Sequence, residues 1–172
     1  MGKEAEKIIY GFYNSLFGEM IIAQTEVGIC WLGFMVEGRK GDGLSRLRKF
    51  FPDADLMRSD TVGNSLGESV INHWRAGLEA DLTLDIRGSD FQLSVWHALL
   101  KITKGNTRSY ADIAQIIGSP KASRAVGSAV GENPVSLIVP CHRVTKKNGD
   151  LGHYGWGDDM KRQMLREEGL KV

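Results

Sequence analysis

The sequence predicts an α/β (α+β) protein, in which a small N-terminal antiparallel sheet with helices precedes a mainly helical C-terminal domain. Short runs rich in Ile, Val, Tyr and Trp lie within the first forty positions, and such runs favour strands. Apolar residues recur at helical spacing in several later segments. The chain has 172 residues, which is enough for one large domain or two small ones with a buried core.

The composition excludes several classes of protein. With 42% hydrophobic and 25% charged residues, the chain is an ordinary globular protein rather than a disordered one. Two cysteines, Cys30 and Cys141, cannot build a disulfide scaffold, and no CxxC pair offers a zinc clip. Apolar runs such as Met20 to Ala23 are far too short to span a bilayer, and the N-terminus lacks a leader-like segment. We therefore expect a reduced, cytoplasmic protein with no membrane partner.

The net charge of +1 hides an uneven distribution along the chain. Residues 1–88 carry 10 basic and 13 acidic side chains, a net charge of −3, whereas residues 89–172 carry 12 and 8, a net charge of +4. Between residues 101 and 147 the net charge is +6. Such asymmetry is typical of a protein with one face toward phosphate. Chance clustering of solvated side chains explains it equally well.

The predicted elements of the first half are three strands and two helices, followed by one more strand. The strands lie at Lys7 to Tyr13, Glu19 to Thr25 and Ile29 to Val36, and the turn residues between them indicate an antiparallel meander. Cys30 falls inside the third strand and is predicted to be a small core residue.

Helices are predicted at Leu44 to Phe51, where Pro52 ends the helix, and at Ser65 to Leu78, where apolar residues recur every fourth position. Alternation of apolar and polar residues from Leu82 to Ile86 predicts the further strand.

A new domain is predicted to begin after Gly88, which divides the chain into residues 1–88 and 89–172. The sequence Ser89-Asp90-Phe91-Gln92 has the form of a capping box. It opens a helix that places Phe91, Val95, Leu99 and Ile102 on one face.

A helix-turn-helix is predicted beyond Ser109. A first helix runs from Tyr110 to Ile117, Gly118-Ser119-Pro120 forms a compact break, and a second helix runs from Lys121 to Val130. The second helix carries mostly small residues, with Arg124 as the one long side chain in its middle. Small residues permit close approach to DNA without reading its bases, and Arg124 could occupy the space of a displaced base. An ordinary pair of core helices with a surface salt bridge at Arg124 fits the same pattern.

A lone cysteine, Cys141, lies directly beside His142 and Arg143. Neighbouring cationic groups favour the reactive thiolate at neutral pH. Three other interpretations remain open on these residues alone. Cys141 could be inert core, it could bind a metal with His142 and His153, or Cys141 and His142 could be the working pair of a cysteine hydrolase.

The second half resembles the O6-alkylguanine-DNA alkyltransferases, also called methylated-DNA–protein-cysteine methyltransferases. Their signature is matched by Pro140-Cys141-His142-Arg143, preceded by Gly131-Glu132-Asn133-Pro134 and by Ser109-Tyr110. The run Asp85 to Gln92 with Val95-Trp96 is similar to the alkyltransferase domain of Ada-type members. The resemblance is dense from about Asp85 to Gly169 and weak before it. It implies a ribonuclease-H-like N-terminal domain and a winged helix-turn-helix C-terminal domain.

The resemblance also implies a suicide reaction that moves the alkyl group of O6-alkylguanine in DNA irreversibly to Cys141, one lesion per molecule, after base flipping. His142 would take the thiol proton through a water, and Glu168 would orient His142. Tyr110 would donate a proton to the leaving guanine, and Asn133 would brace the turn that positions the thiol.

The binding residues implied by the resemblance fall into two groups. The DNA contacts would come from Ser109, Lys121, Ala122, Ser123, Arg124 and Arg143. The pocket for the flipped base would be lined by Val139, Pro140, Tyr154, Gly155 and Trp156. The bulky Trp156 would narrow this pocket and favour methyl over benzyl adducts.

No cofactor and no metal are expected, and the partner would be double-stranded DNA that contains O6-alkylguanine, with O4-alkylthymine as a second lesion, bound by a monomer. Two rival functions stand beside this one. Alkyltransferase-like proteins find lesions but lack the acceptor cysteine, whereas Cys141 is present here. A cysteine hydrolase would turn over many times. No segment of the sequence resembles the regulatory domain of full-length Ada proteins, so no transcription-factor role is expected.

Overall fold

The computed structural model describes residues 4–36, 40–76 and 82–172. The chain forms two compact units, residues 1–86 and 87–172, whereas the sequence predicted the boundary after Gly88. In the described ranges, no helix combines the length and the apolar character needed to cross a bilayer.

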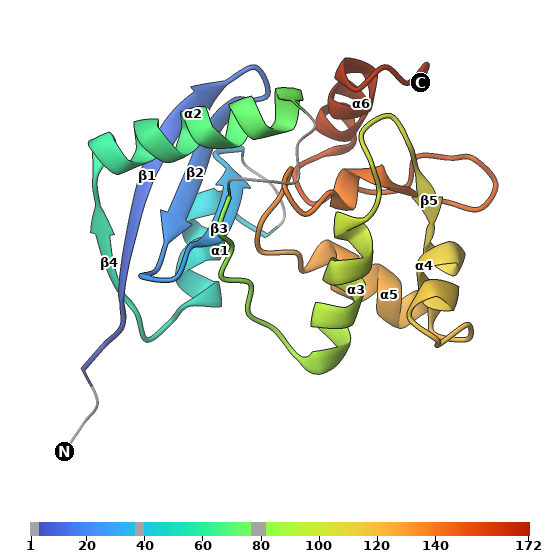
Figure 1. Cartoon of the computed structure of the whole chain (residues 1–172), viewed down its shortest axis with the longest axis horizontal. Helices are drawn as coiled ribbons and strands as arrows, with labels where there is room; N and C mark the ends of the chain where they lie inside the picture. The colour runs from blue at the N-terminus through green and yellow to red at the C-terminus, as the bar shows by residue number, and fades with distance from the viewer. Residues whose placement is uncertain (1–3, 37–39, 77–81) are drawn as a thin grey trace. The chain divides into compact units, whose positions relative to one another are not determined.

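The N-terminal unit is built on a four-stranded sheet in the order β3-β2-β1-β4 (Figure 1). The strands are β1 (Lys7–Ser15), β2 (Gly18–Gln24), β3 (Ile29–Phe34) and β4 (Asp55–Arg58). The first three pair antiparallel, which confirms the predicted meander. The short edge strand β4 pairs parallel with β1 and was not predicted. Its four residues alternate weakly and include two charged side chains, so its pattern resembles a loop.

Two helices cover opposite faces of this sheet. The helices are α1 (Gly43–Phe50) and α2 (Asp60–Ala76). A side-chain carbon added to Gly63 of α2 would lie 2.8 Å from the Cα atom of Gly11 in β1, so the helix lies directly on the strand backbone. Phe12 pairs with Ile21, and Ile21 contacts Gly43 of α1. Because neighbouring residues of a strand point to opposite faces, α1 covers the other side.

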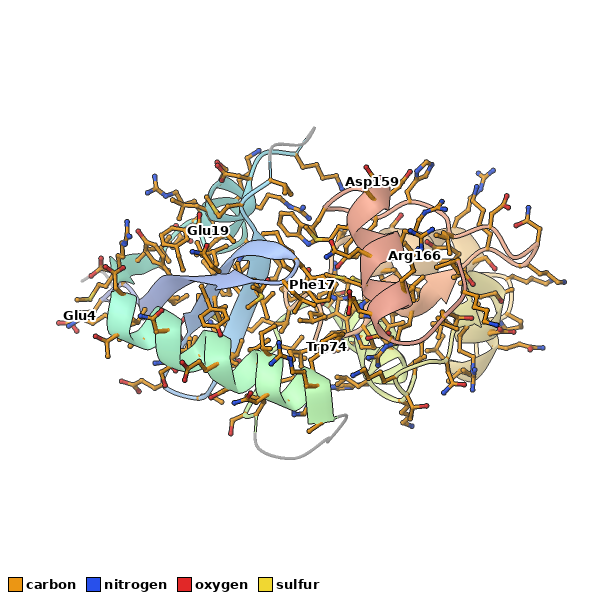
Figure 2. The ribbon with its side chains drawn as sticks, turned by 90° about the horizontal axis from the view of Figure 1, so that it is seen from above. Glu4, Phe17, Glu19, Trp74, Asp159 and Arg166 are labelled. Atoms are coloured by element: carbon orange, nitrogen blue, oxygen red, sulfur yellow. The ribbon has the colours of Figure 1, made fainter. Side chains whose placement is uncertain are left out.

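The predicted start of helix α2 needs correction, whereas the predicted burial of Cys30 is confirmed. Helix α2 begins at Asp60, five residues before the predicted start, because glycines at 63 and 67 weaken its helical pattern while permitting close packing. Its predicted end at Leu78 lies outside the described residues. Figure 2 shows Trp74, near the end of α2, beside Phe17 of the β1–β2 turn. The two rings meet edge to face, with their centroids 5.3 Å apart. Cys30 is fully buried in β3, as predicted.

The strand predicted from Leu82 to Ile86 is wrong as a strand. Only one parallel bridge forms in the described part of this segment, between Ile29 and Leu84. The amide of Ile29 donates to the carbonyl of Thr83, and the amide of Asp85 donates to the carbonyl of Ile29. The Thr25 hydroxyl also hydrogen-bonds the Asp85 carboxylate at 2.6 Å. The segment is thus extended backbone that is hydrogen-bonded to the first residue of β3.

The C-terminal unit is mainly helical (Figure 1). Its elements are α3 (Asp90–Leu100), β5 (Arg108–Ser109), α4 (Tyr110–Ile116), α5 (Ser123–Gly131), the 3-10 helix η1 (Cys141–Arg143), β6 (Val144–Thr145) and α6 (Asp158–Glu167). The predicted capping box at Ser89 and Gln92 opens α3. Trp96 of α3 donates from Nε1 to the carbonyl of Ala129 and so ties α3 to α5. The mixed α/β fold class is confirmed.

The pair α4 and α5 forms where the helix-turn-helix was predicted. Ser109 and Asp112 form a second capping box at the start of α4. Gly118, with φ +78°, ends the first helix in the left-handed conformation that favours glycine. Helix α5 begins at Ser123 rather than at Lys121, and Ala122 is its N-cap. Strands β5 and β6 pair in parallel, with Arg108 opposite Val144. This pairing brings the start of α4 beside the chain that leaves η1.

Candidate active site

A tight loop between α5 and η1 carries Cys141. The Asn133 side chain fixes this loop at two points, because its Nδ2 donates to the carbonyl of Val139 at 2.7 Å and its Oδ1 accepts from the amide of Val135 at 3.0 Å. Leu137 has a φ of 70°, a left-handed conformation that is uncommon for a residue other than glycine. Residues 133–140 of this loop are buried, so the backbone that holds Cys141 is fixed by the core.

Cys141 is 7% exposed. Burial raises the pKa of its thiol, while hydrogen bonds from the Asn133 and Tyr154 side chains and the positive charge of Lys161 act in the opposite direction. The sequence-based expectation that cationic neighbours activate the thiol is therefore incomplete, since burial has the larger effect. The resting thiol keeps its proton and requires a base.

His142 and Glu168 form a buried hydrogen-bonded pair that can act as such a base. Nε2 of His142 lies 3.0 Å from Oε2 of Glu168, and both side chains are fully buried. Burial is the main cause that lowers the pKa of His142, so the ring is neutral at neutral pH. Its Nδ1 atom is buried and has no hydrogen-bond partner in the described part of the chain. Nδ1 is thus the ring atom that is available to receive a proton.

The Arg143 side chain points into the protein, whereas the sequence analysis placed it among the DNA contacts. Its Nε and Nη2 atoms donate to the two carboxylate oxygens of Glu168 at 2.9 and 2.6 Å, and its Nη1 donates to the carbonyl of Ile102 at 2.7 Å. The side chain is 10% exposed. The motif that follows Cys141 therefore directs both a histidine and an arginine to a single buried carboxylate.

Lys161 of α6 was not among the site residues predicted from the sequence. It is fully buried and donates from Nζ to the carbonyl of Val144 at 2.7 Å. Burial lowers its pKa to about 8, although the thiolate form of Cys141 would raise it. Helical spacing gave one weak signal, since Lys161 shares a face with the buried Met164 and Leu165. A lysine on that face is more often solvated, so composition alone could not select it.

Tyr110, at the start of α4, lies close enough to Cys141 to feel the charge of its thiolate. Burial and the nearby charge of the Cys141 thiolate both raise the pKa of its hydroxyl. A side-chain carbon added to Gly152 would lie 3.4 Å from the Tyr110 oxygen, so the segment after β6 approaches the ring closely. A phenol that keeps its proton at neutral pH can serve as a proton donor.

The residues predicted to line a pocket do not share one environment. Val139 and Pro140 are buried, Tyr154 is half-buried and Gly155 is exposed. Trp156 is 7% exposed, and its Nε1 donates to the hydroxyl of Ser136 at 2.8 Å. The indole ring is therefore anchored to the loop that carries Cys141.

The residues predicted to contact DNA lie mostly on the α4–α5 surface. Lys121 and Arg124 are exposed, whereas Ala122 and Ser123 are half-buried. The Ser109 hydroxyl accepts from the amide of Asp112 at 3.0 Å and caps α4. Helix α5 has no acidic residue in its first turn and no side-chain cap, which leaves its N-terminus electropositive.

The metal-binding alternative finds no support in the arrangement of the side chains. In the described ranges, no three His, Cys, Asp or Glu side chains gather closely enough to hold a metal ion. The His153 side chain is 93% exposed and lies 3.9 Å from Asp158.

Fold and site together define a protein with a buried cysteine, next in sequence to the histidine of a buried His–Glu pair, in a unit that also contains a helix-turn-helix. Residues 90–170 match the family described as 6-O-methylguanine DNA methyltransferase, DNA binding domain. The methylated-DNA–protein-cysteine methyltransferase of Methanosarcina acetivorans is 38% identical over 164 residues, which cover 93% of this chain and 97% of that protein. The chain belongs to the methylated-DNA–protein-cysteine methyltransferase family.

Two further matches extend over almost all of the chain. The bifunctional transcriptional activator/DNA repair enzyme Ada of Escherichia coli is 37% identical over 168 residues. These residues cover 97% of this chain but 47% of Ada, so the chain spans about half the length of that relative. The crystal structure of Mycobacterium tuberculosis OGT in complex with DNA matches with a TM-score of 0.76 and 37% identity, and the match covers 93% of this chain and 92% of that chain.

Proposed function

We propose that this chain repairs alkylated DNA by transferring the alkyl group of O6-alkylguanine irreversibly to the sulfur of its own Cys141. The observation that carries the proposal is the buried thiol beside the His142–Glu168 pair, a nucleophile and base supported by an orienting carboxylate. The names of the relatives, and the DNA bound to the Mycobacterium tuberculosis neighbour, support the same substrate.

The reaction begins with loss of the thiol proton from Cys141 to Nδ1 of His142 through a water molecule. The sulfur attacks the alkyl carbon, a carbon–sulfur bond forms, and the bond between that carbon and guanine O6 breaks. The electron pair of the broken bond stays on the guanine, and Tyr110 donates a proton to the ring. The charge of Lys161 stabilises the thiolate in this buried site, where a negative charge is costly.

The product explains why one molecule repairs one lesion. A thioether on Cys141 is stable in neutral water, and no second cysteine lies in the C-terminal unit. The protein is thus both catalyst and acceptor, and it needs no cofactor for the transfer. A reducing compartment such as the cytoplasm keeps the thiol free, so a cytoplasmic location belongs to the same proposal.

DNA binding is assigned to the α4–α5 surface. The small residues of α5 permit close approach to the duplex, and Arg124 fills the space left by the rotated nucleotide. Flipping is least costly for a poorly paired base, which favours O6-alkylguanine over guanine. We further propose that the monomer acts on double-stranded DNA, and that O4-alkylthymine is a second lesion.

The test is the intact mass of the protein after incubation with a duplex that contains one O6-methylguanine. Transfer replaces the thiol hydrogen with a methyl group, so the mass increases by one CH₂ unit, and peptide mapping places the increase on Cys141. The extent of reaction saturates at one lesion per chain, even with excess DNA.

The two cysteines provide a matched pair of controls. Cys141→Ala should bind the same duplex without gaining mass, whereas Cys30→Ala should react like the wild type. Repair of many lesions per chain would indicate a turnover enzyme such as a hydrolase. The absence of any mass increase would contradict the proposed transfer.

A further inference from the structure

We propose that Arg143 is a positioning residue for the transfer, which acts through Glu168 to hold His142 neutral with its proton on Nε2. This inference deepens the proposed function, because it explains how the base is prepared for its task. The sequence offered Arg143 as a DNA contact, whereas the structure directs its donors into the protein.

One carboxylate oxygen carries two partners. Oε2 of Glu168 lies 3.0 Å from Nε2 of His142 and accepts from Nη2 of Arg143 at 2.6 Å. The second oxygen accepts from Nε of Arg143 at 2.9 Å. This forked contact fixes the plane of the carboxylate, since a guanidinium matches a carboxylate with two parallel hydrogen bonds. The carboxylate therefore cannot rotate away from the imidazole without breaking both.

Arg143 is held at its other end as well. Its Nη1 donates to the carbonyl of Ile102, just beyond the end of α3, at 2.7 Å. Ile102 is buried, so this anchor belongs to the core of the unit. The arginine thus links the end of α3 to the end of α6 through Glu168. The carboxylate that binds the His142 ring is therefore held in place from both sides.

The ionised carboxylate decides which nitrogen of His142 carries the proton. Glu168 has a pKa near 2, because hydrogen bonds and charge from Arg143 and His142 outweigh its burial. An ionised carboxylate only accepts hydrogen bonds, so Nε2 must be the donor and Nδ1 keeps its lone pair. This is the atom that is buried without a partner in the described part of the chain.

Arg143 also limits the basicity of the ring. The charged groups that face His142 are Glu168, which favours the protonated ring, and Arg143 and Lys161, which oppose it. A buried carboxylate on its own would draw a proton onto the imidazole and remove its capacity as a base. Because Arg143 binds the same oxygen, it offsets that charge, and the ring is neutral before the thiol is deprotonated.

The first test measures the wild-type protein without DNA. With ¹⁵N-labelled histidine, the ring nitrogen shifts of His142 should report a ring that is protonated on Nε2 and neutral at pH 8 and at pH 7. A ring that is protonated on Nδ1, or charged at pH 7, would overturn the inference. This readout is independent of alkyl transfer, so its failure is distinguishable from a failure of the proposed function.

The second test compares Arg143→Met with Arg143→Lys. Loss of the charge should move the acidic limb of the single-turnover rate upward by about one pH unit, a tenfold change in proton affinity. The lysine variant keeps the positive charge but cannot donate two parallel hydrogen bonds to Glu168. Its pH–rate profile should fall off at the same acidic pH as that of the wild type, while its maximal rate stays lower. The exposed Arg162→Met on the same helix as Lys161 is the control and should match the wild type.

A merely structural role predicts a different result. Both Arg143 variants would then lose rate equally at every pH, with the limb unmoved, and that outcome would overturn the inference. Circular dichroism and a urea titration on each variant establish that it is folded. If Arg143→Met does not fold, the lysine variant and the histidine titration still decide the matter, because the tautomer is measured in the intact protein.

Discussion

Nε2 of His142 and Oε2 of Glu168 lie 3.0 Å apart, and both side chains are fully removed from solvent. This pair is the structural basis of the proposed chemistry, because a buried carboxylate can orient an imidazole without competition from water. The pair joins η1 to the residue that directly follows α6, so the base depends on the last turn of the C-terminal helix as much as on the cysteine motif.

The first prediction concerns Glu168→Gln. The amide has no charge and a single acceptor oxygen, so it cannot satisfy both His142 and the two donors of Arg143. We expect the single-turnover rate at pH 7 to fall by about 10²-fold or more, the usual contribution of a positioned base. Rapid-quench measurement with a methylated duplex checks this. An unchanged rate would show that the base does not depend on Glu168.

Acid stability follows from the same carboxylate. The pKa of Glu168 is lowered from 4.5 to about 2 in the folded state. A lowered folded-state pKa contributes stability that is fully present above the unfolded-state pKa and is lost as pH falls toward the folded-state value. The wild type should therefore lose up to about 3 kcal/mol between pH 4.5 and 2, and the Glu168→Gln variant should lose less. Urea unfolding at pH 5, 4 and 3 measures the difference.

The second prediction concerns the buried cation. Replacement of Lys161 by Met removes a charge that lowers the pKa of Cys141, so the thiolate fraction near pH 7, where Lys161 is protonated, should fall by about tenfold. Iodoacetamide alkylation of Cys141 across pH 6–10 gives this value. Lys171→Met, which changes an exposed lysine, is the control. Equal profiles for both variants would remove Lys161 from the proposed site.

The stability of the Lys161→Met variant separates function from structure. Burial lowers the pKa of Lys161 to about 8 from 10.5, so the folded state binds its proton less tightly than the unfolded state does. At neutral pH this charge is a cost, and the cost disappears as pH rises from 8 to 10.5. The methionine variant should unfold within about 2 kcal/mol of the wild type, even though its thiol reacts more slowly.

The parts of the site that could be predicted from the sequence rest on local signals. The capping boxes at Ser89 and Ser109 depend on residues three positions apart, and the cysteine, histidine and arginine of the motif are consecutive. The antiparallel meander was likewise predictable, because its strands follow one another along the chain. In each case the chemistry and the spacing lie within a few residues.

The parts that could not be predicted depend on contacts between distant segments. Strand β4 exists because Asp55–Arg58 lies along β1, and its own pattern is too short to signal a strand. Arg143 was misplaced because a surface guanidinium and a buried one look alike in sequence. Only the position of Glu168, 25 residues away, shows that the guanidinium faces inward. Lys161 has the appearance of a surface residue in the sequence, but it is buried. The groups that it meets, Cys141 and Val144, lie on other elements.

The third prediction concerns the size of the alkyl group. Trp156 is nearly buried and its ring is fixed by Ser136, so we expect the wild type to react faster with O6-methylguanine than with O6-benzylguanine. Trp156→Ala should raise the relative rate for the benzyl compound by about tenfold or more. It should also cost about 3 kcal/mol of stability, the usual effect of removing a large buried ring. Competition assays with both free bases measure the ratio.

A control variant tests whether the hydrogen bond fixes the ring. Ser136→Ala keeps the indole but removes its acceptor, so its preference should lie between those of the wild type and Trp156→Ala. Equal rates for the methyl and benzyl compounds in the wild type would mean that Trp156 does not narrow the pocket.

The fourth prediction separates DNA handling from chemistry through Arg124. The side chain is exposed on α5 and lies outside the buried network of Cys141, so Arg124→Ala should react normally with free O6-benzylguanine. On duplex DNA its rate should fall by about 10²-fold, because a few kcal/mol of unstacking would no longer be offset. The defect should shrink on single-stranded DNA, where less stacking opposes rotation of the base.

Arg162→Ala on α6 is the control and should match the wild type. Lys121→Ala should instead weaken DNA binding and reduce the salt dependence of that binding. If Arg124→Ala slowed the reaction equally on duplex, single strand and free base, the residue would act on the chemistry, and its proposed place in the flipped duplex would be wrong.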